Sequence, residues 1–450
     1  MSTYQLRHLG SGLGFWCLIL VSTPVVLAQE GKTPGLQCAL PACIQTALER
    51  HPDLQALGAK KSAAQARTGF EAAQWRPLLY GRGQLGYIKG TPSIANEGLR
   101  NREISEGFAA GEAIIELPVV RHGKFWGQET PQFQQAHHEI TAAENEQQTR
   151  REQLAYGVTT AYVTVLKQQE MVQGQEEIVR LTEVLRQGSA AKFAQGLLSR
   201  HDLLMAEVLL ANAQRDLTVS RSALLQSKRE LGRAMGFSAG MAVEALDGVG
   251  LPPLEAPLPT LEALVALAHT HRFELRTQEA QRQIKEAEVA RVRGEQRPSV
   301  DLSAGYEAES LFDERVFTQW RVFATVVVPL WDFGRNAYKV EAAQAAVHEE
   351  EHKGDSLKLQ ITGEVQEAYT QIVDLKAQLA LLATQIAQAA EAVKLRQGQV
   401  EQRLASPATV AEAQIALLKA ESSKAAMRYD ILLAFRKLAL VTSGLQGTTP

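Results

Sequence analysis

"IIELPVVRHGKFWG" (residues 114–127) and "VVVPLWDFGRNAYK" (residues 326–339) share one pattern. Each is an apolar run followed by a proline, three further residues, a ring-bearing side chain, and a glycine with a basic residue after it. The two prolines, Pro118 and Pro329, lie 211 residues apart (329 − 118). A repeat at this distance predicts a duplicated half-molecule, because solenoids repeat every few tens of residues.

The duplication extends well beyond this stretch. "ALERHPDL" (47–54) aligns with "AHTHRFEL" (268–275) at a spacing of 221, and "QGLLSRHDLLMAE" (195–207) aligns with "QRLASPATVAEAQ" (402–414) at a spacing of 207. The spacing falls from 211 to 207 after the quoted stretch, so the first copy carries an insertion of about one helical turn.

Each copy has the same expected order: a short helix, a longer helix, two strands, a very long helix and a return helix. Arg76-Pro77 and Arg297-Pro298 end the longer helix, because the residue before a proline disfavours the helical conformation. The Ala-rich long helices have apolar residues three and four apart, which is typical of coiled coils. The expected first copy (29–247) contains helices 40–51 and 54–76, strands 78–89 and 107–118, and a helical hairpin 124–236 (helices 124–188 and 202–235); a linker 248–260 precedes the second copy (261–450), with helices 260–270 and 274–296, strands 299–308 and 318–329, and a hairpin 335–441 (helices 335–399 and 409–441).

The expected strands alternate between apolar and polar residues. "SVDLSAGYEA" (299–308) places Val300, Leu302 and Tyr306 on one face and Asp301 on the other. Strands of this length, tilted, can cross a bilayer, although a soluble amphipathic sheet has the same pattern. Two hairpins cannot close a barrel, so strands that enter lipid require several chains to share one barrel.

The first residues predict export. Basic residues precede a short apolar stretch, "GLGFWCLILVSTPVVLA" (12–28), in which Val26 and Ala28 supply the small residues that signal peptidase recognises. We therefore expect a signal peptide at 1–28. The alternative is a retained anchor helix, which Pro24 disfavours.

Two cysteines remain once Cys17 leaves with the signal peptide, too few for a zinc site of their own. In an oxidising compartment Cys38 and Cys43 can form a local disulfide, provided that Cys38 lies outside a helix. The segment Leu40-Pro41-Ala42-Cys43 also loosely matches a lipobox, so a lipid on Cys43 is the alternative.

The order of elements, with "ALERHPDL" (47–54), "VPLWDFGRN" (328–336) and "GLLSRHDLLMAE" (196–207), resembles the outer-membrane efflux protein family, the TolC-like channels. The resemblance covers nearly the whole mature chain. It implies a mostly α fold with a transmembrane β-barrel: a homotrimer whose chains each give four strands to a twelve-stranded barrel, continued by a periplasmic helical tunnel, in the outer membrane of a Gram-negative bacterium. Pro118–Gly123 and Pro329–Gly334 resemble the family's strand-to-helix elbows, where proline ends the strand and glycine permits the bend.

The resemblance also implies that the hairpin tips dock onto a periplasmic adaptor protein that works with a proton-driven or ATP-driven inner-membrane pump. The second tip departs from the family pattern, because Arg403 stands at the usual glycine and Ala405 at the usual arginine. Two acidic positions of the family's entrance gate fall at Thr409 and Glu412, so one acidic ring is lost; a solvated helix residue is the alternative for Glu412. The implied docking residues are Gly196, Leu197, Leu198, Ser199, Asp202, Arg403, Leu404, Ser406 and Pro407.

No catalytic, cofactor or metal site is predicted. "HEEEH" (348–352) matches the zinc-protease pattern, but no third ligand is evident, and glutamates stand where such helices bury apolar residues. We interpret this motif, and "AHHE" (136–139), as charged faces of solvated helices. The net charge of −3 gives no basic surface for nucleic acid.

The favoured function is a passive exit duct of a tripartite efflux pump that carries small molecules or metal ions. Four histidines (122, 137, 138 and 201) weakly indicate metals. The alternatives are the outer-membrane component of a type I protein secretion system, a periplasmic coiled-coil protein that never enters the membrane, and an exported zinc peptidase based on residues 348–352.

Overall fold

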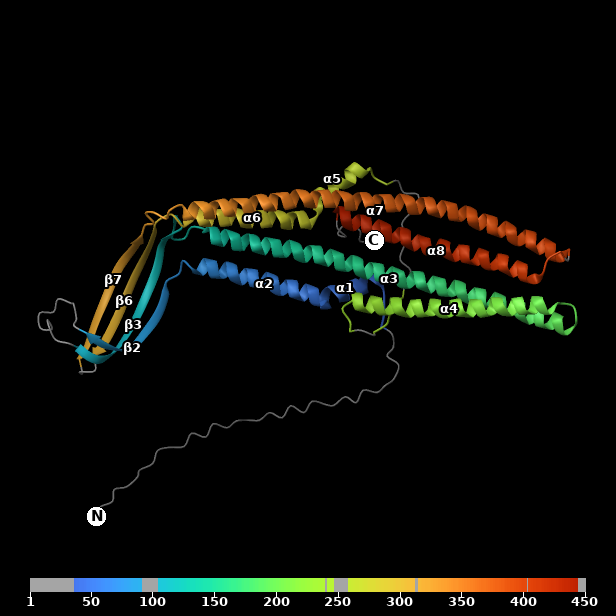
Figure 1. The fold of residues 1–450 in the computed structure, drawn as a ribbon, viewed down its shortest axis with the longest axis horizontal. Helices are drawn as coiled ribbons and strands as arrows, with labels where there is room; N and C mark the ends of the chain where they lie inside the picture. Colours follow the sequence, from blue (N-terminus) through green and yellow to red (C-terminus); the bar gives the residue numbers. More distant parts are fainter. Residues whose placement is uncertain are drawn as a thin grey trace, which may run out of the picture. The chain divides into compact units, whose positions relative to one another are not determined.

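A computed structural model describes residues 36–90, 104–238, 241–246, 258–311, 315–402 and 404–443. The expected signal peptide (1–28), Arg403 and most of the expected linker lie outside these residues. Long helices and a sheet of long strands make up most of the described part of the chain (Figure 1). Among the described helices, none is long and apolar enough to cross a membrane.

The two copies fold alike. In each, two shorter helices lead into a strand pair, and a long helical hairpin follows. The first copy consists of β1 (Leu36–Cys38), α1 (Leu40–Arg50), α2 (Pro52–Ala73), β2 (Leu78–Gly90), β3 (Ile104–Arg121), β4 (Lys124–Phe125), α3 (Pro131–Ala194), α4 (Arg200–Ala234) and β5 (Val243–Ala245). The second consists of α5 (Leu261–His271), α6 (Phe273–Gly294), β6 (Ser299–Leu311), β7 (Arg315–Val327), α7 (Arg335–Glu401) and α8 (Pro407–Ser443).

Two strands from each copy join in one antiparallel sheet, while β1 and β5 pair in a separate parallel sheet. The order of the antiparallel sheet is β2-β3-β6-β7, and the short strand β4 pairs with β3 beside this path. Leu79, Ile115, Ala304 and Val322 lie directly opposite one another across the four strands. Since side chains alternate along each strand, this register places every apolar set of the sequence on one face of the sheet.

Pro118 does not end its strand, contrary to the expected boundary. Pro118 lies opposite Asp301, and the ladder continues with Val120 opposite Val300 after a bulge at Val119. The carbonyl of Val119 accepts a hydrogen bond from the backbone N–H of Trp126 at 2.9 Å. The bulged residue is thus satisfied by the turn that follows, so β3 extends past its proline.

The first long helix begins at Pro131, later than the expected residue 124. The intervening segment forms the hairpin of β3 with β4. Thr130 then caps the helix, with its hydroxyl oxygen accepting the N–H of Phe133 at 3.1 Å, and Pro131 occupies the first turn, where no N–H is needed. The second copy has no such hairpin, and α7 starts directly after the turn at Gly334.

Each copy has its own apolar core where the short helix packs against the long hairpin. The core of the first copy includes Ala47, Val158 and Leu231, and that of the second includes Ala268, Val365 and Leu438. These residues match in pairs at the spacings of the sequence repeat, 221 for the alanines and 207 for the others. The duplication is therefore confirmed at the level of packing.

The helices of the two copies lie side by side. Within each copy the long helix packs against its return helix, α3 with α4 and α7 with α8. Between the copies α3 contacts both α6 and α8 (Figure 1).

A disulfide joins Cys38 at the end of β1 to Cys43 in the first turn of α1, with 5.9 Å between the Cα atoms. Cys38 lies in a strand, as this bond requires. Cys43 is fully buried in the first core, so its sulfur is not available for a lipid.

Candidate functional site

The turn between α3 and α4 closes with hydrogen bonds typical of a helix ending in a left-handed residue. Gly196 has φ of 72°, which a glycine adopts without strain. Its N–H donates to the carbonyl of Phe193, and the N–H of Leu197 donates to the carbonyl of Lys192, both at 2.9 Å. The side chain of Leu197 is left 73% exposed at the tip.

Ser199 and Asp202, two predicted docking residues, cap the start of α4. The Ser199 hydroxyl oxygen accepts the N–H of Asp202 at 3.2 Å, and the hydroxyl donates to the Asp202 carboxylate at 2.6 Å. This reciprocal pair stabilises the first turn of the helix. Leu198 is half-buried beside them.

The second tip repeats this geometry with different residues. The N–H of Leu404 donates to the carbonyl of Gln399 at 2.8 Å, which matches the Leu197 bond at a spacing of 207. Ser406 caps α8, with its hydroxyl oxygen accepting the N–H of Ala408 at 3.2 Å, and Pro407 occupies the first helical position. Leu404 is 75% exposed, so the two tips present matched leucines.

Thr409 and Glu412, the predicted gate residues, lie one turn apart at the start of α8. The Thr409 hydroxyl donates to the carbonyl of Ser406 at 2.8 Å and is therefore engaged in the cap. The side chain of Glu412 is exposed, and no ion pair within the described residues holds it.

Two consecutive residues with positive φ form each strand-to-helix turn. In the first copy these are His122 (53°) and Gly123 (72°), which close the hairpin of β3 with β4. A Cβ on Gly123 would overlap the side chain of Arg297, and a Cβ on Gly294 would overlap His122. The first turn therefore packs closely against the end of α6.

In the second copy Phe333 (56°) and Gly334 (81°) have the same conformation, and β7 has already ended before Pro329. The Asp332 carboxylate accepts the N–H groups of Gly334 at 3.0 Å and of Asn336 at 2.8 Å, which caps α7. The rings at this turn remain in solvent, with Phe333 89% exposed.

The two faces of the sheet differ in chemistry. One face carries large apolar side chains that remain exposed, among them Leu85 at 84% and Trp320 at 78%. The opposite face carries ion pairs, including Arg82 with Glu112 at 3.0 Å and Arg321 with Glu307 at 3.1 Å. The exposed apolar side chains of the first face are Leu79, Leu85, Tyr87, Ile115, Leu302, Tyr306, Val316, Trp320, Val322 and Val326, and the opposite face also exposes Leu78, Phe323 and Val327.

The histidine motif at 348–352 lies on an exposed stretch of α7. The His348 ring Nδ1 lies 3.0 Å from the Glu351 carboxylate, and the His348 side chain is 70% exposed. Nowhere in the described residues do three or more His, Cys, Asp or Glu side chains come together to hold a metal ion. His137 and His138 are neighbours on α3 with ring centroids 6.1 Å apart.

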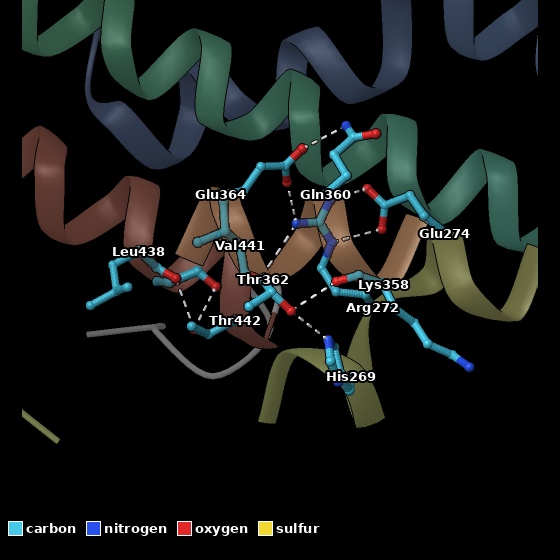
Figure 2. Close-up of polar contacts among 11 residues, drawn as sticks. His269, Arg272, Glu274, Lys358, Gln360, Thr362, Glu364, Leu438, Val441 and Thr442 are labelled. Carbon is cyan, nitrogen blue, oxygen red and sulfur yellow. Dashed lines mark hydrogen bonds and ion pairs between the residues drawn. The ribbon is translucent and has the colours of Figure 1, made fainter. Parts of the chain in front are cut away.

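A buried arginine joins four helices of the second copy (Figure 2). Arg272, only 12% exposed, separates α5 from α6. Its guanidinium donates to both oxygens of Glu274 at 2.9 and 3.1 Å and to Glu364 on α7 at 2.8 Å. It also reaches the carbonyl of Val441 on α8 at 3.5 Å. Burial alone would lower the pKa of Arg272, but the hydrogen bonds and charges of both carboxylates raise it, so the side chain stays charged.

This junction was not predicted from the sequence. Arg272 lies within "AHTHRFEL", which was used only to mark the repeat, and its counterpart in the first copy is His51. His51 likewise separates two helices, and its Nδ1 accepts the N–H of Asp53 at 3.3 Å. The available signal was an arginine with an acid two residues later, at a predicted break between helices.

Glu152 on α3 faces this junction without a complete set of partners. One of its carboxylate oxygens is buried and has no hydrogen bond. Burial raises the pKa of Glu152, the nearby charge of Glu274 raises it further, and Arg272 opposes both effects. The ionised form of Glu152 is therefore unfavourable in the folded chain.

A family profile described as outer membrane efflux protein matches residues 43–237 and 264–444. The two matched segments correspond to the two copies of the repeat. A search of curated protein sequences found no significant match.

Solved structures share the fold along most of the chain. CusC, whose structures concern transmembrane channel formation, is 17% identical, with 93% of this chain and 96% of CusC covered and a TM-score of 0.75. A membrane protein from Pseudomonas aeruginosa is also 17% identical, with 91% of each chain covered and a TM-score of 0.76. The outer membrane protein VceC from Vibrio cholerae is 16% identical, with 90% of this chain and 96% of VceC covered and a TM-score of 0.72. Identities this low show similarity of fold alone.

We predict that Arg272→Ala destabilises the chain by about 2 to 3 kcal/mol, because two partly buried carboxylates lose their counter-charge. Thermal unfolding in detergent, followed by circular dichroism, measures the effect. Arg282→Ala is the matched control, since Arg282 on α6 also binds two glutamates, Glu279 and Glu286, but at an exposed surface. We expect the control to change the stability by less than about 0.5 kcal/mol. Equal losses in the two variants would contradict the assigned role of the junction.

We predict that Glu152→Gln raises the melting temperature at about pH 7 and has no such effect in acid. The folded-state pKa of Glu152 is raised, so the stability associated with its neutral form is complete below the unfolded pKa and is lost as the pH rises through the folded pKa. Glutamine mimics the neutral form and removes that loss. Glu144→Gln, at an exposed position of the same helix, is the control. A gain that is independent of pH would contradict this account.

Proposed function

The chain belongs to the outer membrane efflux protein family, and from this premise we propose that it is a passive exit duct spanning the outer membrane and the periplasm. The observation that carries the proposal is the four-stranded sheet, which exposes an apolar face on one side and ion pairs on the other. This pattern is that of a lipid-facing barrel wall with a polar lumen.

Barrel closure requires more than one chain. The strand path ends at β2 on one side and at β7 on the other. Backbone groups at such edges cannot remain unpaired in hydrocarbon. We propose that β2 of one chain pairs with β7 of the next chain, so that three chains close a twelve-stranded barrel. The turns Pro118–Gly123 and Pro329–Gly334 are the elbows at which the chain leaves the barrel, and Trp126 and Trp331, both exposed, anchor them in the membrane interface.

The repeat supports a contact between the helices of neighbouring chains that matches the contact of α3 with α8 inside one chain. Inside the chain α3 packs so closely on α8 that a Cβ on Gly174 would overlap the hydroxyl of Ser422. The equivalent of Gly174 on α7 is Leu381, which is 70% exposed in the single chain. We propose that α7 of one chain covers α4 of the next chain, in the same way as α3 covers α8 within one chain. The exposed apolar residues that this contact covers are Leu359, Val373, Leu381 and Leu395 on α7 and Leu204, Val208, Val219 and Leu225 on α4.

We propose that the two hairpin tips dock onto a periplasmic adaptor protein. The capped turns hold Leu197 and Leu404 in solvent at equivalent places, which suits insertion into an apolar groove of a partner. The other predicted residues divide between the first turn (Gly196, Leu198) and the helix caps (Ser199, Asp202, Ser406, Pro407), and Arg403, also predicted to dock, lies outside the described residues. Thr409 and Glu412 form the entrance gate of this proposal, with Glu412 as its only ionised side chain.

We propose small molecules or metal ions as cargo, delivered by an inner-membrane pump. The name of the family, which refers to efflux, supports small molecules or metal ions as cargo over export of a protein. The duct itself supplies no energy, which comes from the pump.

The proposal is tested by crosslinking in vivo and affinity capture of the full-length protein from the native membrane, with partners identified by mass spectrometry. Recovery of an adaptor with a proton-driven pump supports efflux. Recovery of an ATP-driven exporter moves the function to protein or peptide secretion. A protein found in the soluble fraction with neither partner contradicts the duct.

We predict that Leu197→Asp combined with Leu404→Asp lowers adaptor capture at least about tenfold, because charged side chains cannot enter an apolar groove without a large desolvation cost. Trimer formation in detergent should stay unchanged, since the tips lie outside the proposed contacts between chains. Leu246→Asp, at an exposed leucine remote from the tips, is the control. Undiminished capture in the double variant would show that the tips do not dock.

A further inference from the structure

One row of polar side chains crosses all four strands of the sheet. Arg82 on β2 lies opposite Glu112 on β3, Glu112 lies opposite Glu307 on β6, and Glu307 lies opposite Gln319 on β7. Arg321, two residues further along β7, points to the same face as Gln319. These five side chains, the charged row, therefore stand at nearly one height of the sheet.

Ion pairs connect the charged row from end to end. Glu112 is held by Arg82 at 3.0 Å and by Arg321 at 3.2 Å. Glu307 is held by Arg321 at 3.1 Å and receives a hydrogen bond from the Gln319 amide at 2.8 Å. Like charges directly opposite each other on neighbouring strands are destabilising, so the contact of Arg321 with both glutamates neutralises a repulsion built into the register.

Acidic residues outnumber arginines on this face. Asp301 lies near Arg121 at 3.7 Å, whereas no ion pair within the described residues holds Glu116 or Glu309. Among the described side chains on this face there is an excess of one negative charge per chain. The acids are Glu112, Glu116, Asp301, Glu307 and Glu309, and the bases are Arg82, Arg121, Lys124 and Arg321.

We propose that, in the closed barrel of the proposed function on which this inference rests, the charged row together with the unpaired acids Glu116 and Glu309 forms a belt around the lumen that favours cations, and that Arg321 limits this preference. Three chains bring the acidic excess together around one axis. Rings of carboxylates favour cations, and low-dielectric walls concentrate their field. The lumen would thus act on charged cargo after the cargo has already passed the entrance.

The belt is distinct from the entrance gate. The helices that separate the sheet from the hairpin tips contain 64 residues in α3 and 67 in α7. At 1.5 Å per residue they span roughly 100 Å, about twelve Debye lengths at physiological salt. Charge changes at Glu412 and at the belt should therefore act independently.

The test measures ion selectivity of the purified full-length trimer in planar lipid bilayers, from the reversal potential under a potassium chloride gradient. Arg321→Gln removes three positive charges per trimer and should raise the ratio of potassium to chloride permeability at least about twofold. Glu309→Gln should lower the ratio, and no described ion pair is broken by that change. Both shifts should fade near 1 M salt, where the Debye length falls to about 3 Å.

Arg321→Lys is the matched control, because it keeps the charge and loses the fork that bridges two carboxylates. It should lower the thermal stability of the trimer and leave the permeability ratio unchanged. If Arg321→Gln does not assemble, Glu309→Gln alone decides the question. An unchanged ratio in the neutralised variants overturns the belt and leaves the charged row with a purely structural role. Failure of the unmodified trimer to conduct ions overturns the proposed duct itself, together with the belt.

Discussion

A sheet that is apolar on one face and charged on the other cannot satisfy both faces in one solvent. This constraint governs the rest of the molecule. The exposed side chains of Leu85 and Trp320 favour an apolar surrounding, while Glu112 and Arg321 on the reverse need water or counter-charges. The unpaired edges of β2 and β7 add a requirement for further strands. The proposed shared barrel would meet all three demands together.

The duplication preserves backbone geometry more faithfully than residue identity. The turn at Leu197 and the turn at Leu404 close with the same hydrogen bond, although Arg403 replaces the glycine of the first tip. The residue between the two short helices is His51 in one copy and Arg272 in the other, and only Arg272 gathers carboxylates from two other elements. Helix ends and turns fix the backbone geometry, so the side chains that form ion pairs can differ between the two copies.

Sequence patterns predicted the elements well where one local rule decides the outcome. The alternation of Val300, Leu302 and Tyr306 predicted the strand and its apolar face, and the Arg-Pro pairs predicted helix ends to within three residues, since α2 ends at Ala73 and α6 at Gly294. The rule that proline ends a strand was wrong at Pro118, because a bulge and a short partner strand, absent from the second copy, extend the ladder. The charged row could not be predicted, since the opposition of Glu112 and Glu307 depends on a register between strands nearly 200 residues apart.

The contacts that join the two copies differ from the contacts that stabilise each copy internally. Each apolar core belongs mainly to one copy, whereas polar contacts such as Lys167 with Asp430, at 2.7 Å, connect α3 to α8. Partly exposed ion pairs of this kind contribute little net stability and can be exchanged for water at small cost. Sliding of the second hairpin along the first would break these polar contacts and the close contact of Gly174 with Ser422, but the buried residues of each core would stay packed within their own copy. Opening of the proposed entrance gate would draw on this division, because rearrangement of an apolar core would cost far more.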